Sequence, residues 1–147
     1  MSNSKLNNQG FTLLEIMVVV VILSILAIYV APKIMGKPDE ARINAAMLQI
    51  KSFESALKFY KLHNFVYPTT EQGLDALVSP PESGTLPKNF QKGGYMDKIP
   101  KDPWGNDYIF LSPGAQNADS FDLMSYGADG QPGGEDENAD INNWNLE

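Results

Sequence analysis

The fold is decided by residues 9–31, which read QGFTLLEIMVVVVILSILAIYVA. The 21 residues from Phe11 to Ala31 are almost all apolar, and Glu15 is the only charged residue among them. A helix rises about 1.5 Å per residue, so this run is long enough to cross about 30 Å of hydrocarbon. We therefore expect residues 11–31 to form one apolar helix that spans a membrane.

The carboxylate of Glu15 is unusual in such a helix. On insertion scales a charged side chain costs about 2–3 kcal/mol inside a membrane helix, and less near the interface, so it calls for a partner. A plain signal anchor would leave Glu15 at the level of headgroup water. A secretory signal peptide fits less well, because its apolar core has about 7–15 residues and ends in a small-residue cleavage site. Cleavage between Gly10 and Phe11 would instead free an α-amine close to Glu15, and the amine and carboxylate of neighbouring chains could then neutralise each other.

A short polar leader that ends in glycine, followed by Phe-Thr-Leu-Leu-Glu and an apolar helix, resembles the type IV prepilin signature. The resemblance implies that residues 1–10 are a leader peptide, which a prepilin peptidase at the inner membrane removes by cutting after Gly10. It also implies N-methylation of Phe11. In this family the glutamate at the position of Glu15 pairs with the N-terminus of an adjacent subunit during assembly, so residues 11–31 are expected to form the core of a helical filament.

Charge is distributed unevenly along the chain. All eleven basic residues lie at or before Lys101, whereas residues 102–147 carry ten acidic side chains and no basic one. This acidic part argues against nucleic-acid binding, which needs lysine and arginine against the phosphates. The chain has no cysteine, which excludes disulfides and cysteine zinc sites and is compatible with the periplasm.

The charges beside the apolar run and the prepilin resemblance predict opposite topologies. Lys5 precedes the run, and Lys33, Lys37 and Arg42 follow it closely. The positive-inside rule alone would place the C-terminal side in the cytoplasm. The resemblance implies a single-pass inner-membrane protein, with its leader in the cytoplasm and residues 32–147 as a globular domain in the periplasm. We follow the resemblance, because its motif is more specific than a charge count.

Beyond the apolar run the sequence predicts a second helix. Two prolines and a glycine predict a kink or a locally melted stretch across 32–38. From Asp39 onward, apolar side chains recur every three or four residues and form one stripe that should pack on a core. The members of this stripe are Ile43, Met47, Ile50, Phe53, Leu57 and Tyr60.

The segment after the second helix favours a short helix and a loop. Thr69 and Gln72 have the spacing of a capping box, which predicts a short helix over about 70–78. Residues 82–101 should form a loop rich in proline, glycine and lysine. Two aromatic side chains are expected to anchor it, Phe90 and Tyr95.

The next segment favours a hairpin. DPWGN at 102–106 predicts a turn, and the segments 107–111 and 121–126 predict two antiparallel strands. The expected fold class is therefore α+β, with a long N-terminal helix packed against a small antiparallel sheet.

The acidic loop at 126–140 is the second informative motif. It reads YGADGQPGGEDENAD and holds five carboxylates, with four glycines and a proline among residues 127–134. These glycines let the chain bend sharply, so that carboxylates and backbone carbonyls can converge on one point. Hard oxygen ligands in a flexible set of about six to eight suit Ca²⁺ better than Mg²⁺ or zinc. The spacing of an EF-hand is absent, and the loop chemistry alone leaves two interpretations open, a calcium site or a solvated acidic loop.

Three short motifs narrow the family. DPWGN at 102–106, GADG at 127–130 and ADINNW at 139–144 resemble the major pseudopilins of the type II secretion system, which belong to the type IV pilin-like superfamily. The likeness covers nearly the whole chain, from Gly10 to Trp144, so the fold it implies is pilin-like.

The pseudopilin resemblance also implies a structural calcium ion in the C-terminal loop. At the matching positions, the side-chain ligands would be Asp129 and Asp136. Backbone carbonyl oxygens would complete the site, from Tyr126, Gln131 and Asn138. The resemblance leaves a role for Asp140 open.

The function implied by the resemblance is structural, without enzymatic activity. The subunits would polymerise into a helical fibre in the periplasm, the pseudopilus, which helps export folded proteins across the outer membrane. Expected partners are further copies of the chain, the prepilin peptidase and minor pseudopilins. An inner-membrane assembly platform and a cytoplasmic secretion ATPase would act on it indirectly.

Two other classes compete with this interpretation. A type IV pilin for adhesion, motility or DNA uptake has the same N-terminal signature, but many such pilins close their C-terminal region with a disulfide, which this chain cannot form. The second class is a calcium-binding enzyme anchored in the membrane and facing the periplasm. Such an enzyme would need a set of catalytic residues. The chain has no cysteine and a single histidine, His63, for which we expect a surface or capping role. Catalysis by paired carboxylates is the enzymatic chemistry that composition leaves open.

Overall fold

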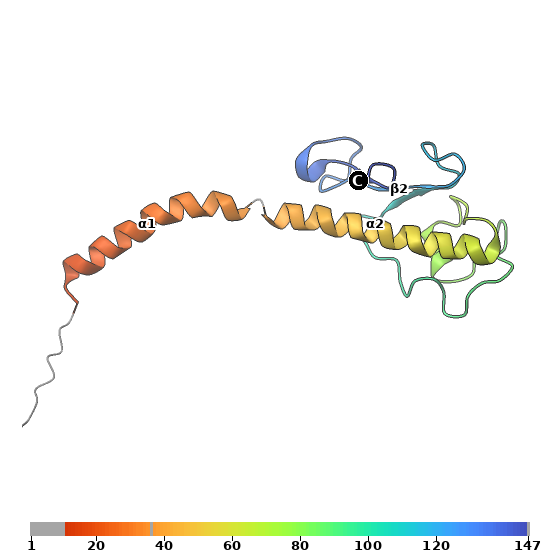
Figure 1. The fold of residues 1–147 in the computed structure, drawn as a ribbon, viewed down its shortest axis with the longest axis horizontal. Coiled ribbons are helices and arrows are strands. Elements are labelled where there is room, and N and C mark those ends of the chain that lie inside the picture. Colours follow the sequence, from red (N-terminus) through yellow and green to blue (C-terminus); the bar gives the residue numbers. More distant parts are fainter. Residues whose placement is uncertain (1–10, 36, 147) are drawn as a thin grey trace, which may run out of the picture. The chain divides into compact units, whose positions relative to one another are not determined.

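The computed structural model describes residues 11–35 and 37–146. The expected leader, residues 1–10, lies outside the described residues. Contacts divide the chain into two compact units, Met1–Pro38 and Asp39–Glu147. The elements are helices α1 (Leu13–Met35) and α2 (Lys37–Asn64), the 3-10 turns η1 (Leu74–Leu77) and η2 (Asp136–Asn138), and strands β1 (Ile109–Leu111), β2 (Asp122–Ser125) and β3 (Ile141–Asn142). Figure 1 labels α1, α2 and β2.

The first unit is built on α1, which runs past the expected end of the apolar helix at residue 31. Among the described residues of the range 32–38 the expected melted stretch is not found, because α1 continues through Pro32 to Met35 and α2 already begins at Lys37. A proline removes one hydrogen bond and can be accommodated inside a helix. Pro38 falls in the first turn of α2, where a backbone N–H has no helical partner to lose. The kink remains a prediction.

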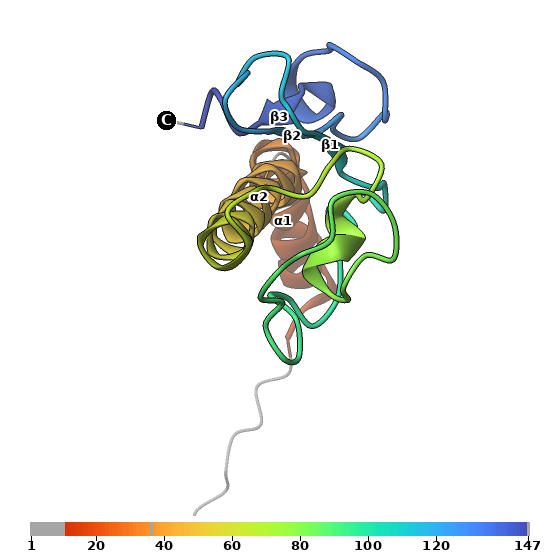
Figure 2. The ribbon, with the colours of Figure 1, turned by 90° about the vertical axis from the view of Figure 1, so that its right-hand side faces the viewer.

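The second unit is organised around α2, and the predicted apolar stripe is confirmed. Four of its members, Ile50, Phe53, Leu57 and Tyr60, are fully buried, and the other two pack against the same core. Their partners include aromatic side chains of the sheet region, such as Tyr108, whose ring centroid lies 5.1 Å from that of Phe53. Burial of each large apolar side chain stabilises the unit by about 1.5–3 kcal/mol. Figure 2 shows the sheet lying along one side of α2.

The sheet has three antiparallel strands in the order β1-β2-β3. The two expected strands are confirmed in shorter form, with Phe110 of β1 opposite Leu123 of β2. The sequence does not predict β3, which pairs with β2 through Ser125 opposite Ile141. Asn143 holds β3 in place, because its side-chain oxygen accepts the N–H of Leu123 at 2.9 Å and its own N–H donates to the Leu123 carbonyl at 3.0 Å.

The segment between α2 and the sheet matches the expected contacts but not the expected helix. The capping box is confirmed, since the N–H of Thr69 donates to Gln72 Oε1 at 3.0 Å and the N–H of Gln72 donates to Thr69 Oγ1 at 3.2 Å. The predicted helix shrinks to the four-residue turn η1, because Gly73 adopts a φ of 63° and interrupts helical geometry. Phe90 and Tyr95 pack against the core as expected.

The turn at 102–106 is held by the buried carboxylate of Asp102. Its Oδ1 accepts the N–H groups of Trp104 at 3.1 Å and Asn106 at 2.8 Å. Its Oδ2 accepts the hydroxyl of Ser125, at the end of β2, at 2.6 Å. Ser125 Oγ in turn accepts the N–H of Gly127 at 3.2 Å, and the side chain of Asn106 donates to the Gly127 carbonyl at 3.2 Å. The turn, the end of β2 and the start of the acidic loop therefore form one hydrogen-bonded network.

Replacing Asp102 by alanine should lower the free energy of unfolding of the second unit by about 2–4 kcal/mol, because three donors lose their buried acceptor. Urea unfolding of the full chain in mild detergent measures this change, followed by the fluorescence of Trp104 and Trp144, the two tryptophans of the chain. The control is Asp107→Ala. That side chain is 83% exposed and pairs with Lys101, so its loss should cost less than about 0.5 kcal/mol. Equal destabilisation by both variants would contradict the role given to Asp102.

Candidate functional site

The acidic loop folds back on itself through close backbone contacts. The N–H of Ala128 donates to the carbonyl of Glu137 at 2.9 Å. A Cβ atom at Gly127 would lie 2.8 Å from that carbonyl oxygen, and one at Gly134 would lie 2.4 Å from the carbonyl oxygen of Asn138. Both glycines also have positive φ angles, 66° and 92°, so a side chain is excluded at both positions. The start and the end of the loop therefore lie side by side.

The five predicted calcium ligands do not share one environment in the structure. Tyr126 and Asn138 belong to the two segments that meet where the loop closes. Asp129 and Asp136 are exposed, and Asp129 Oδ1 accepts the N–H of Gln131 at 3.0 Å. Within residues 11–35 and 37–146, no group of three or more aspartate, glutamate or histidine side chains is placed to hold a metal ion. The predicted set uses only two carboxylates, and it stays a prediction.

Two oxygen atoms beside Asp136 are buried without a donor. Oδ1 of Asp140 and Oδ1 of Asn142 accept no hydrogen bond from the part of the chain that the structure describes, although Oδ2 of Asp140 accepts the N–H of Gly133 at 3.0 Å. Asp136, Asp140 and Asn142 line one cavity of about 170 Å³. A buried acceptor without a donor costs about 1–3 kcal/mol, and more when it is charged. A hard cation would offset this cost, because it prefers carboxylate and amide oxygens. These residues therefore fit Ca²⁺.

The sequence leaves the role of Asp140 open and carries no separate signal for Asn142. Both residues lie in the ADINNW motif at 139–144. This motif is the sequence signal that could have pointed to them. Their burial depends on the folding of the loop over α2, since Ile43 and Met47 of that helix line the same cavity. A contact between residues so far apart in the sequence produces no recognisable pattern in consecutive residues.

At the N-terminal motif the structure contains a contact that sequence reasoning missed. The N–H of Glu15 donates to Thr12 Oγ1 at 3.2 Å, and the N–H of Thr12 donates to Glu15 Oε2 at 3.3 Å. This reciprocal pair is a capping box, and the Thr-x-x-Glu spacing is its sequence signal. Glu15 is thus hydrogen-bonded within its own helix, and its expected pairing with an adjacent subunit stays a prediction. Phe11 is 81% exposed, and Gly10 lies outside the described residues.

The apolar side chains of α1 are exposed in the single chain. Every residue from Leu13 to Ile28 is exposed, and all of them except Glu15 and Ser24 are apolar. Such a continuous apolar surface marks a site that something else covers. Among the described residues, no helix combines the length and the hydropathy that crossing a membrane requires. The membrane span expected at 11–31 stays a prediction.

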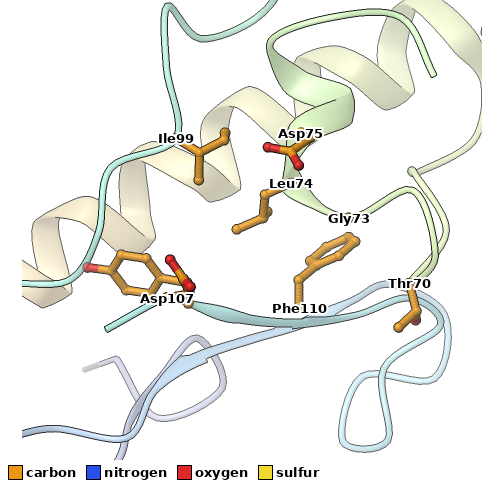
Figure 3. A pocket seen from close by; sticks show the side chains of 8 residues that line it. Thr70, Gly73, Leu74, Asp75, Ile99, Asp107 and Phe110 are labelled. Atoms are coloured by element: carbon orange, nitrogen blue, oxygen red, sulfur yellow. The ribbon is translucent and has the colours of Figure 1, made fainter. Parts of the chain in front are cut away.

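An open cleft of about 390 Å³ lies between η1 and β1. In Figure 3, Leu74, Ile99 and Phe110 form its apolar part, while Asp75 and Asp107 lie apart from each other at its margin. Thr70 also lines the cleft, but its hydroxyl donates to the Ser112 carbonyl at 3.2 Å and accepts the Ser112 N–H at 2.8 Å. The threonine hydroxyl is therefore engaged in holding the backbone.

The remaining polar groups near the cleft are also engaged. Burial, and secondarily the charge of Asp102, raises the pKa of Tyr108, so the phenol stays protonated and donates to the side-chain oxygen of Gln49. His63 is half-buried away from the cleft lining, with Nδ1 at 3.3 Å from the hydroxyl of Tyr95. The cleft thus offers two separated carboxylates and an apolar floor.

Two family models match the chain. Residues 33–144 match the model described as Type II secretion system (T2SS), protein G, and residues 5–31 match the Prokaryotic N-terminal methylation motif. The chain is 55% identical over 136 residues to the type II secretion system core protein G of Pseudomonas aeruginosa, with 92% of this chain and 94% of that protein covered. It is 54% identical over 138 residues to the protein of the same description from Vibrio cholerae, with 94% and 92% covered.

A solved structure is similar as well. It is the crystal structure of the major pseudopilin from the type 2 secretion system of enterohaemorrhagic Escherichia coli, with 45% sequence identity and a TM-score of 0.66. The match covers 77% of this chain and 95% of that chain. The resemblance drawn from the turn, the loop and the N-terminal motif is thereby confirmed. The chain belongs to the type II secretion system protein G family, the major pseudopilins.

Proposed function

We propose that the chain is the major structural subunit of a type II secretion pseudopilus. It polymerises into a periplasmic helical fibre that helps export folded proteins across the outer membrane, and it has no enzymatic activity. The observation that carries this function is the match of residues 33–144 to the protein G model, together with the methylation motif at 5–31. Relatives from several bacteria that share about half of its residues are type II secretion core proteins, which favours a pseudopilin over a pilin for adhesion, motility or DNA uptake.

The N-terminal motif determines how the subunit is processed, held in the membrane and assembled. A prepilin peptidase removes residues 1–10 and N-methylates Phe11, and residues 11–31 hold the subunit in the inner membrane with residues 32–147 in the periplasm. An assembly platform and a secretion ATPase then act on it indirectly, and minor pseudopilins join the same fibre. The apolar exposure of α1 supports this proposal, because the same side chains can face lipid before assembly and other helices afterwards.

Glu15 has two tasks in this proposal. Within its own helix it caps the N–H of Thr12, which satisfies one of the free donors at the helix start. In the fibre its negative charge pairs with the amine of Phe11 on an adjacent subunit, because a charge in an apolar surrounding needs a counter-charge. The first task needs an acceptor oxygen, whereas the second needs a charge.

A calcium ion stabilises the C-terminal loop in this proposal. Side chains of Asp129 and Asp136 would hold it, with carbonyl oxygens of Tyr126, Gln131 and Asn138. The buried free oxygens of Asp140 and Asn142 support a cation beside Asp136. When bound, Ca²⁺ supplies positive charge that joins the acidic side chains, and it raises stability because the unfolded chain has no formed site.

Replacing Gly10 by valine should leave the leader uncut, because a bulky side chain at the junction blocks the peptidase. Mass spectrometry of the N-terminus measures this on the full chain made in cells with the peptidase. The unchanged chain should begin with a methylated Phe11. The control Asn8→Ala lies in the same leader and should be processed normally. Normal cleavage of Gly10→Val would contradict the assignment of the junction.

The two tasks of Glu15 are separated by two substitutions. Glu15→Leu removes both the acceptor and the charge, whereas Glu15→Gln keeps an acceptor for the N–H of Thr12. Both variants should insert in the membrane, and both should lower the yield of sheared fibres more than about tenfold, since losing one partner of a buried charge pair costs about 2–5 kcal/mol. Immunoblots of the fibre and membrane fractions measure the two properties. Normal fibres from Glu15→Gln would show that capping, not charge, is required.

Saturating Ca²⁺ should raise the melting temperature of the second unit by at least about 5 °C relative to chelator. The combined substitution of Asp129 and Asp136 by asparagine should abolish this rise, and Asp140→Asn should reduce it. The control Glu135→Gln, an exposed acid in the same loop, should keep the full rise. Circular dichroism or tryptophan fluorescence of the full chain measures the transition. The calcium site is wrong if chelator leaves the melting temperature of the unmutated chain unchanged.

A further inference from the structure

The side of α2 that faces away from the core carries an exposed apolar ridge. Leu48, Phe59 and Leu62 are 68%, 58% and 67% exposed, and their spacing places them on one face of the helix. Ser55 lies between them, and its hydroxyl donates to the carbonyl of Lys51 at 2.9 Å. These four residues, Leu48, Ser55, Phe59 and Leu62, are the outer face of α2. A row of large exposed apolar side chains marks an interaction site more often than scattered single ones do.

Two lysines border the outer face. Lys51 and Lys58 are exposed, and their separation of seven residues places them on the same side of the helix. The ion pairs among residues 11–35 and 37–146 are Arg42–Asp39 and Lys101–Asp107, so both lysines, and Glu54 between them, make none there. The outer face therefore presents apolar surface beside positive charge.

The matching negative charge lies on the acidic loop. Glu135 and Glu137 flank the proposed ligand Asp136, and residues 102–147 contain no basic residue. In Figures 1 and 2 this loop, drawn in blue, lies on the sheet side of α2, which is the side of its buried stripe. The outer face points the other way. The two surfaces are complementary in charge, yet they cannot meet within one subunit.

We infer that the outer face of α2 docks on the acidic loop of a second copy of the chain, with Lys51 and Lys58 against Glu135 and Glu137. The apolar ridge lies against the glycine- and proline-rich part of the same loop. This inference rests on the proposed function, because it supplies a contact that polymerisation repeats. Two different surfaces that meet head to tail add copies without limit unless the rotation closes a ring, which is the geometry of a helical fibre. The opposite charges set the register of the contact.

Charge reversal and its rescue test this contact in cells that assemble the full chain. The double variant Lys51→Glu, Lys58→Glu should lower the fibre yield at least about tenfold, because like charges then face each other. Adding Glu135→Lys and Glu137→Lys to the same chain should restore the yield to within about twofold, because the charges oppose again. The control is Lys88→Glu with Lys92→Glu, which changes the net charge equally at two exposed lysines outside the outer face and should keep normal fibres.

Cysteine cross-linking tests the same contact by proximity. The chain has no cysteine of its own, so two differently tagged copies can carry one cysteine each. Phe59→Cys on one copy and Glu135→Cys on the other should form an intermolecular disulfide within fibres. The control pair, Lys92→Cys with Glu135→Cys, should not.

The outcomes separate this inference from the proposed function. Loss of fibres on reversal, rescue by the second reversal and the specific cross-link support the contact together. Intact fibres from the reversed variant, or a Phe59→Cys side chain that links only to other proteins of the apparatus, overturn the inference and leave the pseudopilin function standing. The absence of any fibre from the unmutated chain would instead overturn the proposed function.

Discussion

The second unit depends on one buried carboxylate, that of Asp102. It joins the turn at 102–106 to the end of β2 and, through Ser125, to the first residues of the acidic loop. A carboxylate can hold several donors because it has two oxygens with about four lone-pair positions, and burial strengthens each bond by excluding competing water. The loop that is proposed to bind calcium therefore starts from a fixed point. A metal that binds a loop with a fixed start has less chain to order than one that binds a free segment.

The chain exposes apolar side chains and unbalanced negative charges that a protein folded as a monomer in water usually buries or neutralises. Apolar side chains are exposed along α1 and on the outer face of α2, and the acidic loop carries charges that no basic residue in 102–147 can balance. Each of these features is a cost for an isolated subunit. This cost is removed when further copies, lipid or a cation cover the apolar surface or balance the charge, so these surfaces suit a subunit that assembles.

Patterns in consecutive residues predicted most of the fold. The features that were not predicted depend on contacts between segments far apart in the sequence. The buried stripe of α2, the Thr69–Gln72 capping box and the two longer strands were predictable, because each is written in consecutive residues. Strand β3 was not, since two residues are too few to show a period. Nor was the network of Asp102, whose partner Ser125 is 23 residues away. At the N-terminal motif, the sequence pointed to a role of Glu15 in assembly, but its capping of Thr12 was overlooked. At the C-terminal loop, the sequence does not indicate that one side-chain oxygen of Asp140 and one of Asn142 are buried without a hydrogen-bond donor, because this burial arises only when the loop packs beside α2.

The short strands at the sheet edges have a consequence for the kind of fibre that the chain can form. The edges are β1, with three residues, and β3, with two. An edge this short offers few unpaired N–H and C=O groups to a strand of another molecule. Stacking of sheets from many chains into amyloid-like cross-β structure needs longer segments, typically about six residues. The sheet of the second unit therefore offers little template for cross-β pairing when polymerisation brings many copies together.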